Sequence, residues 1–271
     1  MKHVNFVAEI SANHLGSLSR AHLLVEAVSR AGANSVKLQT YKAETMTLNL
    51  SKFRVSRDHN LWGGVNLYQL YEEAMTPWEW HKELFQHASE LGIEAFSSPF
   101  DRGAVDFLEG LNCPIYKIAS LETGDIDLIS YVASTGKRMI ISTGASTLEE
   151  IERAVEAAEL VRDKLTLLVC TSSYPAEPAD AHVNRITTLR EKFNVDVGLS
   201  DHTLGIGVSV AAIALGATVI EKHLTIKRSD GGHDAAFSLE PEEFKLLVEE
   251  GNRAHAALGS SEWSIQDSEA E

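Results

Sequence analysis

Eight short apolar segments recur along the chain, and each is followed by a stretch with apolar residues at helical spacing. The segments are residues 4–11, 35–40, 94–98, 114–120, 138–144, 165–173, 195–202 and 218–223. Short continuous apolar runs are typical of strands buried in a parallel sheet. Helices are expected at residues 19–34, 78–92, 103–111, 125–136, 147–161, 185–193, 206–216 and 241–258. The pattern therefore predicts eight alternations of strand and helix.

Eight β/α units in 271 residues predict a (β/α)8 barrel, the TIM-barrel fold of the α/β class. An open doubly wound sheet is the alternative, but the first segment is not followed by the GxGxxG turn of its commonest version. We expect the barrel to form one domain over residues 1–258. Residues 259–271 lack periodicity and are expected to form an acidic tail or a linker stub.

One connection is unusually long. The stretch 41–75 follows the second segment, whereas an ordinary βα loop has about 2–6 residues. It contains the aromatic residues Trp62, Tyr68 and Tyr71. Two interpretations remain open: a lid over the barrel rim, or a surface insertion with its own small cluster.

Composition and charge narrow the class of partner. The chain is 44% hydrophobic and 23% charged, which is ordinary for a globular protein, and its formal net charge is −15 at pH 7. This charge argues against nucleic acid or an anionic membrane as the main partner, but not against a small anionic substrate. The N-terminus lacks the apolar region of a signal peptide, and no apolar run reaches transmembrane length. We therefore expect a cytoplasmic protein, with Cys113 and Cys170 as buried free thiols.

Polar or ionisable residues stand at or near the end of nearly every apolar segment. They include Glu9, Lys37, Gln39, Ser98, Lys117, Ser120, Glu122, Ser142, Ser172, His202 and His223. In a barrel of parallel strands these ends meet on one rim, which is where TIM-barrel enzymes have their active sites. The pattern therefore indicates an enzyme.

Two histidines mark the last two predicted strands. His202 closes the seventh segment and His223 the eighth, with Asp201 and Glu221 close by. Neighbouring strands lie about 4.8 Å apart, so imidazoles at adjacent strand ends can share one metal ion. The spacing favours a divalent metal over two structural histidines. It leaves the identity of the metal open, because imidazole suits several transition metals whereas carboxylate or water ligands suit Mn²⁺ or Mg²⁺.

Two lysines lie inside apolar segments. Lys37 belongs to the second segment and Lys117 to the fourth. Their ammonium groups would hold a phosphate or carboxylate, together with the hydroxyls of Ser98, Ser120, Ser142 and Ser200. The rival interpretation makes a desolvated Lys117 the nucleophile of a Schiff base. The serines favour the anion site, since an amine nucleophile gains nothing from so many hydroxyl donors.

Carboxylates complete the expected rim. Glu9, near the end of the first segment, would bind a sugar hydroxyl or act as a base, and a salt bridge to a nearby lysine is its competing role. Asp234 follows the eighth segment in the loop DGGHDAAFS and would serve the same functions. Gly231 and Gly232 in this loop permit close approach to a ligand.

The motifs resemble those of the sialic acid synthases, also called nonulosonic acid synthases. They are AEISANHLGS, VKLQTYKAETMTL, FSSPFD, YKIAS, IISTG, CTSSYP, GLSDHTLGIG and ATVIEKHLT, and the resemblance runs from about residue 4 to 258. Within that family, LYEEAMTPWEWHKELF and SDGGHDAAFSLEPEEF are most similar to pseudaminic acid synthases. N-acetylneuraminate and legionaminate synthases are close relatives.

The resemblance implies that phosphoenolpyruvate condenses with an N-acylated amino sugar, here a 2,4-diacetamido-2,4,6-trideoxy hexose. Phosphate leaves by C–O cleavage, and a nine-carbon nonulosonic acid forms. A divalent metal is implied, commonly Mn²⁺ with Mg²⁺ or Co²⁺ as alternatives, and its histidines fall on His202 and His223. The implied phosphoenolpyruvate-binding residues are Lys37, Ser98, Lys117, Ser120, Ser142, Ser172 and Ser200. Sugar contacts are implied at Gln39, Tyr174 and Asp234, an essential acid at Glu9, and a further polar contact at Glu122.

Two departures from the family pattern matter. Ser172 stands where N-acetylneuraminate synthases can carry Asn. Family members usually continue into a C-terminal antifreeze-like domain, which brings an arginine to the partner's active site in a homodimer. The sequence ends at Glu271 without this domain, so we expect complete phosphoenolpyruvate and metal sites but an incomplete sugar site.

Three functional hypotheses follow. The leading one is a metal-dependent phosphoenolpyruvate synthase that makes pseudaminic acid, with N-acetylneuraminate or legionaminate as alternative products. The second is a Schiff-base aldolase acting through Lys117. The third is a non-catalytic barrel that binds an anionic sugar.

Overall fold

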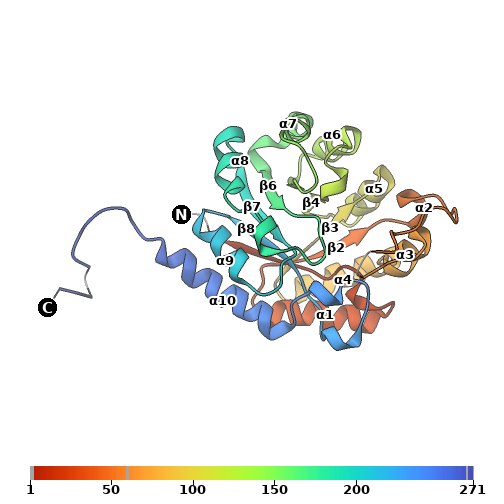
Figure 1. The fold of residues 1–271 in the computed structure, drawn as a ribbon, viewed down its shortest axis with the longest axis horizontal. Helices are drawn as coiled ribbons and strands as arrows, with labels where there is room; N and C mark the ends of the chain where they lie inside the picture. The colour runs from red at the N-terminus through yellow and green to blue at the C-terminus, as the bar shows by residue number, and fades with distance from the viewer. Residues whose placement is uncertain (1–2, 59–60, 267, 271) are drawn as a thin grey trace.

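The barrel prediction is confirmed. The computed structural model describes residues 3–58, 61–266 and 268–270. Eight parallel strands close on themselves in chain order, as Figure 1 shows. They are β1 (Asn5–Glu9), β2 (Ser35–Thr40), β3 (Glu94–Pro99), β4 (Ile115–Ile118), β5 (Arg138–Ser142), β6 (Leu165–Cys170), β7 (Asp196–Asp201) and β8 (Val219–His223). Each lies within its predicted segment, except that Pro99 extends β3 by one residue.

A helix follows each strand on the outside of the barrel (Figure 1). These helices are α1 (Leu18–Arg30), α4 (Trp78–Glu90), α5 (Arg102–Gly110), α6 (Ile126–Ser134), α7 (Leu148–Ala157), α8 (Arg185–Phe193), α9 (Gly207–Ala214) and α10 (Pro241–Ala257). Short 3-10 turns include η1 (Ser11–His14), η2 (Ser120–Glu122), η3 (Glu159–Lys164), η4 (Pro178–Asp180), η5 (Arg228–Asp230) and η6 (Ala235–Phe237). Three of them, η1, η2 and η6, lie after β1, β4 and β8 and shape the rim.

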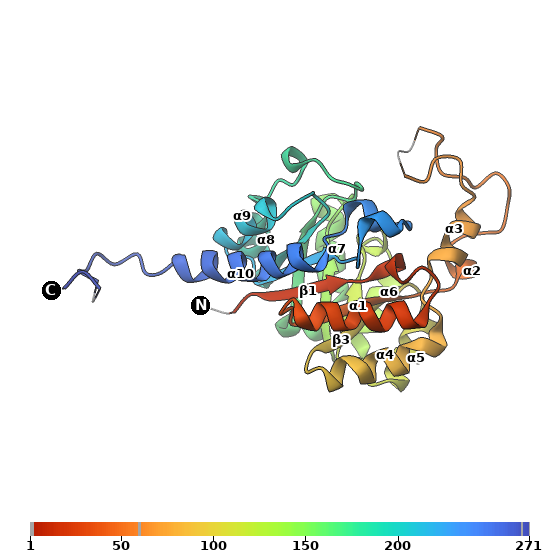
Figure 2. The same ribbon diagram turned by 90° about the horizontal axis from the view of Figure 1, so that it is seen from below.

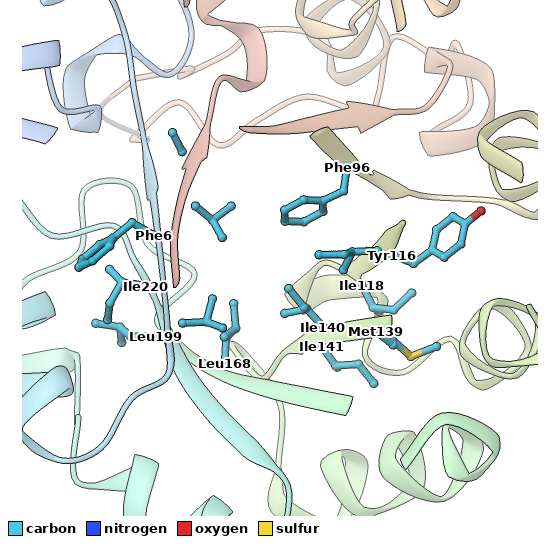
Figure 3. Packing of buried hydrophobic residues seen from close by; sticks show 14 of the residues in the cluster. Phe6, Phe96, Tyr116, Ile118, Met139, Ile140, Ile141, Leu168, Leu199 and Ile220 are labelled. Carbon is cyan, nitrogen blue, oxygen red and sulfur yellow. The ribbon is translucent and has the colours of Figure 1, made fainter. Parts of the chain in front are cut away.

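The hydrophobic core runs from the barrel interior to the layer between strands and helices. Figure 3 shows Phe6, Leu168, Leu199 and Ile220 packing in this core, and all four are buried. Phe6 approaches α10 so closely that a Cβ on Gly251 would lie 2.6 Å from its ring. Only glycine therefore lets α10 pack directly on this side of β1.

The long connection after β2 projects from the rim. It contains α2 (Ala43–Met46) and α3 (Leu67–Ala74), and residues 59–60 within it lie outside the described part of the chain. In Figure 2, β1 runs from the N-terminus toward the end of the molecule where this connection projects. Trp62 Nε1 donates a hydrogen bond to the carbonyl oxygen of His233 at 3.0 Å, which ties the connection to the loop after β8. This contact with the rim favours the lid interpretation.

At the opposite end, the chain leaves the barrel after α10. Figure 1 shows the tail extending away from the body, and Trp263 and Ile265 in it are exposed. Residues 267 and 271 lie outside the described part. Within the described residues, no helix has both the length and the apolar character needed to cross a membrane.

Candidate active site

A buried network of charges forms the floor of the candidate site. Lys37 Nζ lies 2.8 Å from Glu9 Oε2 and 2.9 Å from Glu221 Oε1. Lys117 Nζ lies 3.7 Å from the same oxygen of Glu221, and Ser200 Oγ donates to it at 3.0 Å. All five residues are buried. Glu221 therefore joins the lysines of β2 and β4 across the barrel.

Burial and the neighbouring charges together shift the pKa of each ionisable group in the network. Burial alone would raise the pKa of Glu221, but the ammonium groups of Lys117 and Lys37 lower it to about 2. Burial would likewise lower the pKa of Lys37, yet the carboxylates of Glu221 and Glu9 raise it. Burial prevails at Lys117, whose pKa is lowered, because its nearest carboxylate is farther away. The neighbouring carboxylates therefore stabilise the charged form of Lys37 more strongly than the charged form of Lys117.

Glu9 forms a salt bridge to a lysine, which is the competing role considered for it from the sequence. Its carboxylate forms the salt bridge with Lys37 and accepts a hydrogen bond from the Ser11 N–H at 2.8 Å. Burial raises its pKa, against the lowering effect of Lys37. The structure thus places Glu9 beside the lysine of the floor rather than in open solvent.

The two histidines lie side by side above the floor. The ring centroids of His202 and His223 are 5.4 Å apart. The carbonyl oxygen of Thr171 only accepts, so His202 Nδ1–H donates to it at 2.9 Å. Burial would lower the pKa of His202, but the neighbouring Cys170 thiol raises it. His223 Nδ1 is buried without a partner in the described structure, and burial holds the pKa of this residue well below its usual value. Two imidazoles at adjacent strand ends suit a divalent metal, which binds them in their deprotonated form.

The acidic neighbours of the histidines divide between two sides of the sheet. Glu221 faces the barrel interior, whereas Asp201 pairs with Lys222 at 2.9 Å and accepts from Ser209 of α9 at 2.6 Å. Asp201 therefore lies on the helix side and does not belong to the candidate metal site. Among the described residues, no group of three or more His, Cys, Asp and Glu side chains has metal-site geometry.

Several polar atoms around the floor are buried without a hydrogen-bond partner among the described residues. They are the hydroxyls of Ser98, Ser142 and Ser172, together with Glu122 Oε2, Glu221 Oε2 and His223 Nδ1. A buried polar group without a partner costs about 1–3 kcal/mol. Such a concentration at one place is typical of a site that a polar ligand completes.

A cavity of about 610 Å³ opens above this floor. Its lining includes Gln39, Ser120, Glu122, Ser172, Tyr174, His223 and Asp234 among the residues predicted from the sequence. The other predicted residues, Glu9, Lys37, Ser98, Lys117, Ser142, Ser200 and His202, are buried beneath or beside the lining. The barrel thus brings the whole predicted set to one end of the molecule, in an upper and a lower tier.

Asp234 and Tyr174 belong to the upper tier. The carboxylate of Asp234 accepts from Ser11 Oγ, and from the Ala12 N–H at 3.3 Å, which fixes the loop after β8 against η1. Burial raises the pKa of Asp234. The ring centroid of Tyr174 lies 4.5 Å from that of His202.

Sequence reasoning missed three features of the site. Phe237 places its ring 4.9 Å from His223 and 5.1 Å from Tyr174, and the only sequence signal was its position after the DGGHD turn. Glu221 was noted only as a neighbour of the histidines. Gly144, after β5, approaches the serines so closely that a Cβ would lie 2.4 Å from Ser172 Oγ, and no spacing rule reveals this approach.

Known proteins are similar to this chain over nearly its whole length. The model of the NeuB family matches residues 24–263. The pseudaminic acid synthase of Campylobacter jejuni is 42% identical over 98% of this chain and 78% of its own length. The pseudaminic acid synthase of Helicobacter pylori is 44% identical over 94% of this chain and 76% of its own length.

A solved structure shows the same architecture. The N-acetylneuraminic acid synthetase of Leptospira borgpetersenii, in complex with citrate, superposes with a TM-score of 0.89 and is 32% identical. The match covers 99% of this chain and 89% of that one. The family model and these close matches together show that the chain belongs to the NeuB family.

Proposed function

We propose that the chain condenses phosphoenolpyruvate with a 2,4-diacetamido-2,4,6-trideoxy hexose and thereby makes pseudaminic acid. One observation carries the proposal: one end of the barrel brings two buried lysines, two imidazoles and several hydroxyls without a partner among the described residues to a single cavity. Membership in the NeuB family and the pseudaminic acid synthases among its relatives support the choice of reaction and product. A cytoplasmic location remains a prediction from the sequence, and the homodimer remains a property of the family that is untested for this chain.

Phosphoenolpyruvate would occupy the floor. An ammonium group has three donors, and Lys117 uses one on the carbonyl oxygen of Ile118 at 3.3 Å. Its remaining donors and the hydroxyls of Ser98, Ser142 and Ser172 match the oxygens of a phosphate and a carboxylate. Lys37, held by two carboxylates, would add a fixed positive charge beside them.

His202 and His223 would hold a divalent ion, with Mn²⁺ as the first choice and Mg²⁺ or Co²⁺ as alternatives. The unpartnered His223 Nδ1 and the oriented His202 ring fit such an ion, with water or substrate oxygens as further ligands. When bound, the ion would polarise the aldehyde oxygen of the open-chain sugar as a Lewis acid.

The chain's own side chains would then position the reactants. The lysines and serines would hold phosphoenolpyruvate with its C3 toward the sugar aldehyde in near-attack geometry. Positive charge develops at C2 as the carbon–carbon bond forms. The Glu9 carboxylate on the floor is suited to stabilise this charge or to orient the water that adds there. Phosphate leaves after the water adds.

A phosphate-release assay tests the proposal. The protein would be incubated with phosphoenolpyruvate, Mn²⁺ and each of three sugars: the trideoxy diacetamido hexose, its legionaminate-series isomer and N-acetylmannosamine. We expect fastest release with the first sugar and formation of a nine-carbon acid. Fastest release with either of the others would assign a different nonulosonic acid, and no release with any sugar would overturn the proposed function.

One observation favours the Schiff-base alternative, namely the lowered pKa of Lys117 that burial produces. A deprotonated amine at this position would attack the carbonyl of pyruvate. Borohydride reduction in the presence of pyruvate distinguishes the two reactions. We expect no mass adduct on Lys117, whereas a stoichiometric adduct would establish the aldolase.

Gly144→Ala is expected to weaken phosphoenolpyruvate binding. The added Cβ would lie 2.4 Å from Ser172 Oγ and 2.7 Å from Ser120 Oγ, so both hydroxyls must turn away. Each hydrogen bond to a charged group contributes about 1.5–3 kcal/mol, so KM for phosphoenolpyruvate should rise about 10-fold or more. Gly124→Ala is the matched control, because its Cβ would meet nothing within 4 Å. Equal KM values for the two variants would contradict this role of Gly144.

A further inference from the structure

The lining of the cavity above the floor contains two chemically different sets of side chains. The polar set includes Gln39, Ser120, Glu122, Ser172, His223 and Asp234. The apolar set, which we call the apolar wall, consists of Met46, Val55, Leu67, Leu70, Ala74 and Phe100. Apart from Phe100, which lies just after β3, the apolar wall comes entirely from the long connection after β2.

The apolar wall is built on a fixed support. The ring of Tyr41, which is 3% exposed, lies 5.3 Å from Phe100 and 5.8 Å from Tyr71 between centroids. Trp78 Nε1 donates to the carbonyl oxygen of Tyr41 at 3.1 Å. Asn66 caps α3 by accepting from the Tyr68 N–H at 3.0 Å. These contacts hold the wall in place before a ligand arrives, which is what a selective surface requires.

The position of the wall relative to the histidines fixes which end of a sugar it would meet. In the proposed reaction the aldehyde carbon must lie near His202 and His223, which belong to the β7–β8 side of the barrel. The far end of the open chain then extends toward the β2–β3 side, where the apolar wall stands. A hydroxyl group there would lose its water and gain no partner from aliphatic side chains.

We infer that the apolar wall determines sugar specificity by packing against the methyl groups of a 6-deoxy, N-acylated substrate. The inference rests on the proposed function and identifies Leu70 and Met46 as specificity residues. A sugar with hydroxyls at C4 and C6 is disfavoured at this surface. A difference of one methyl or hydroxyl group at an apolar surface changes selectivity roughly 10- to 100-fold.

Binding of unreactive sugar alcohols tests the inference separately from catalysis. The alcohols are the reduced forms of the 2,4-diacetamido-2,4,6-trideoxy hexose and of a 2-acetamido-2-deoxy hexose, titrated calorimetrically with phosphoenolpyruvate present. We expect the wild-type protein to bind the first alcohol roughly 10- to 100-fold more tightly. Leu70→Asn, which gives a hydroxyl group a partner, should reduce this ratio at least about 3-fold.

Two further variants make the result interpretable. Leu70 is 8% exposed, so its replacement can affect folding; Met46→Gln keeps the side-chain length at a partly exposed position and should also lower the ratio. Leu23→Asn, the same change on the exposed face of α1, should leave the ratio unchanged.

Equal wild-type affinities for the two alcohols, or a ratio unchanged in both wall variants, would overturn the inference. Failure of the wild-type protein to bind either alcohol would overturn it too. Selective binding of the first alcohol, without phosphate release when phosphoenolpyruvate is incubated with the reactive sugars, would support the specificity role of the apolar wall and refute only the proposed reaction.

Discussion

Glu221→Gln is expected to destabilise the protein and nearly abolish phosphoenolpyruvate turnover. The substitution keeps the shape but removes the charge that lies 2.9 Å from Lys37 and 3.7 Å from Lys117. Removing one partner of a buried ion pair costs about 3–5 kcal/mol, because the other charge stays buried. Both lysines also exchange a charged acceptor for a neutral amide, and at about 1.5–3 kcal/mol per charged hydrogen bond kcat/KM should fall about 100-fold or more.

The same carboxylate makes a pH-dependent contribution to stability. The lysines lower its pKa to about 2, below the ordinary value of 4.5, so the folded state binds fewer protons than the unfolded state between these values. Its stabilisation is therefore fully present above about pH 4.5 and is lost as the pH falls toward 2. Chemical denaturation at pH 7 and at pH 3 measures the effect: the stability gap between wild type and Glu221→Gln should be smaller at pH 3.

Glu249→Gln is the matched control for this variant. Glu249 lies on an exposed face of α10, and its substitution should change stability by less than about 0.5 kcal/mol. A Glu221→Gln protein as stable and active as this control would show that the floor does not depend on the shared carboxylate.

His223→Ala is expected to remove both metal binding and most of the activity. The proposed ion has only two histidines from the described chain, so loss of one leaves half of its protein ligands. Lewis-acid stabilisation supplies several kcal/mol, and at 1.36 kcal/mol per tenfold phosphate release should slow about 10²- to 10⁴-fold. Calorimetric titration with Mn²⁺ provides a second readout, in which the heat of binding should disappear.

His255→Ala, near the end of α10 and far from the rim, is its control and should bind Mn²⁺ as the wild type does. Metal-free His223→Ala protein with wild-type phosphate release would rule out the metal-dependent reaction. Unchanged Mn²⁺ binding would instead place the ion elsewhere.

The floor explains why two lysines can lie inside apolar strands. Lys37 and Lys117 face Glu9 and Glu221, so each buried lysine has a carboxylate within 3.7 Å. An anionic ligand would therefore meet lysines that already have acidic partners, and hydroxyls without a partner among the described residues would supply its further hydrogen bonds. This also reconciles an anion site with a chain whose formal net charge is −15.

The architecture could be predicted from the amino-acid sequence. Eight apolar runs that alternate with helical stretches favour a closed barrel over an open doubly wound sheet, and the strand bounds follow the runs closely. The polar residues at the strand ends could also be identified as rim residues, because the carboxyl ends of parallel strands lie at the same edge. Both inferences depend on local periodicity, which the amino-acid sequence shows directly.

How those residues meet depends on the three-dimensional packing of the barrel. Side-chain alternation on β7 and β8 turns Asp201 and Lys222 toward α9 and leaves Glu221 facing the lysines, a distinction that depends on strand register. The pairing of Glu9 with Lys37, the approach of Gly144 to Ser172 and the apolar wall join segments distant in sequence. Such contacts arise from barrel closure and side-chain packing, which no local pattern specifies.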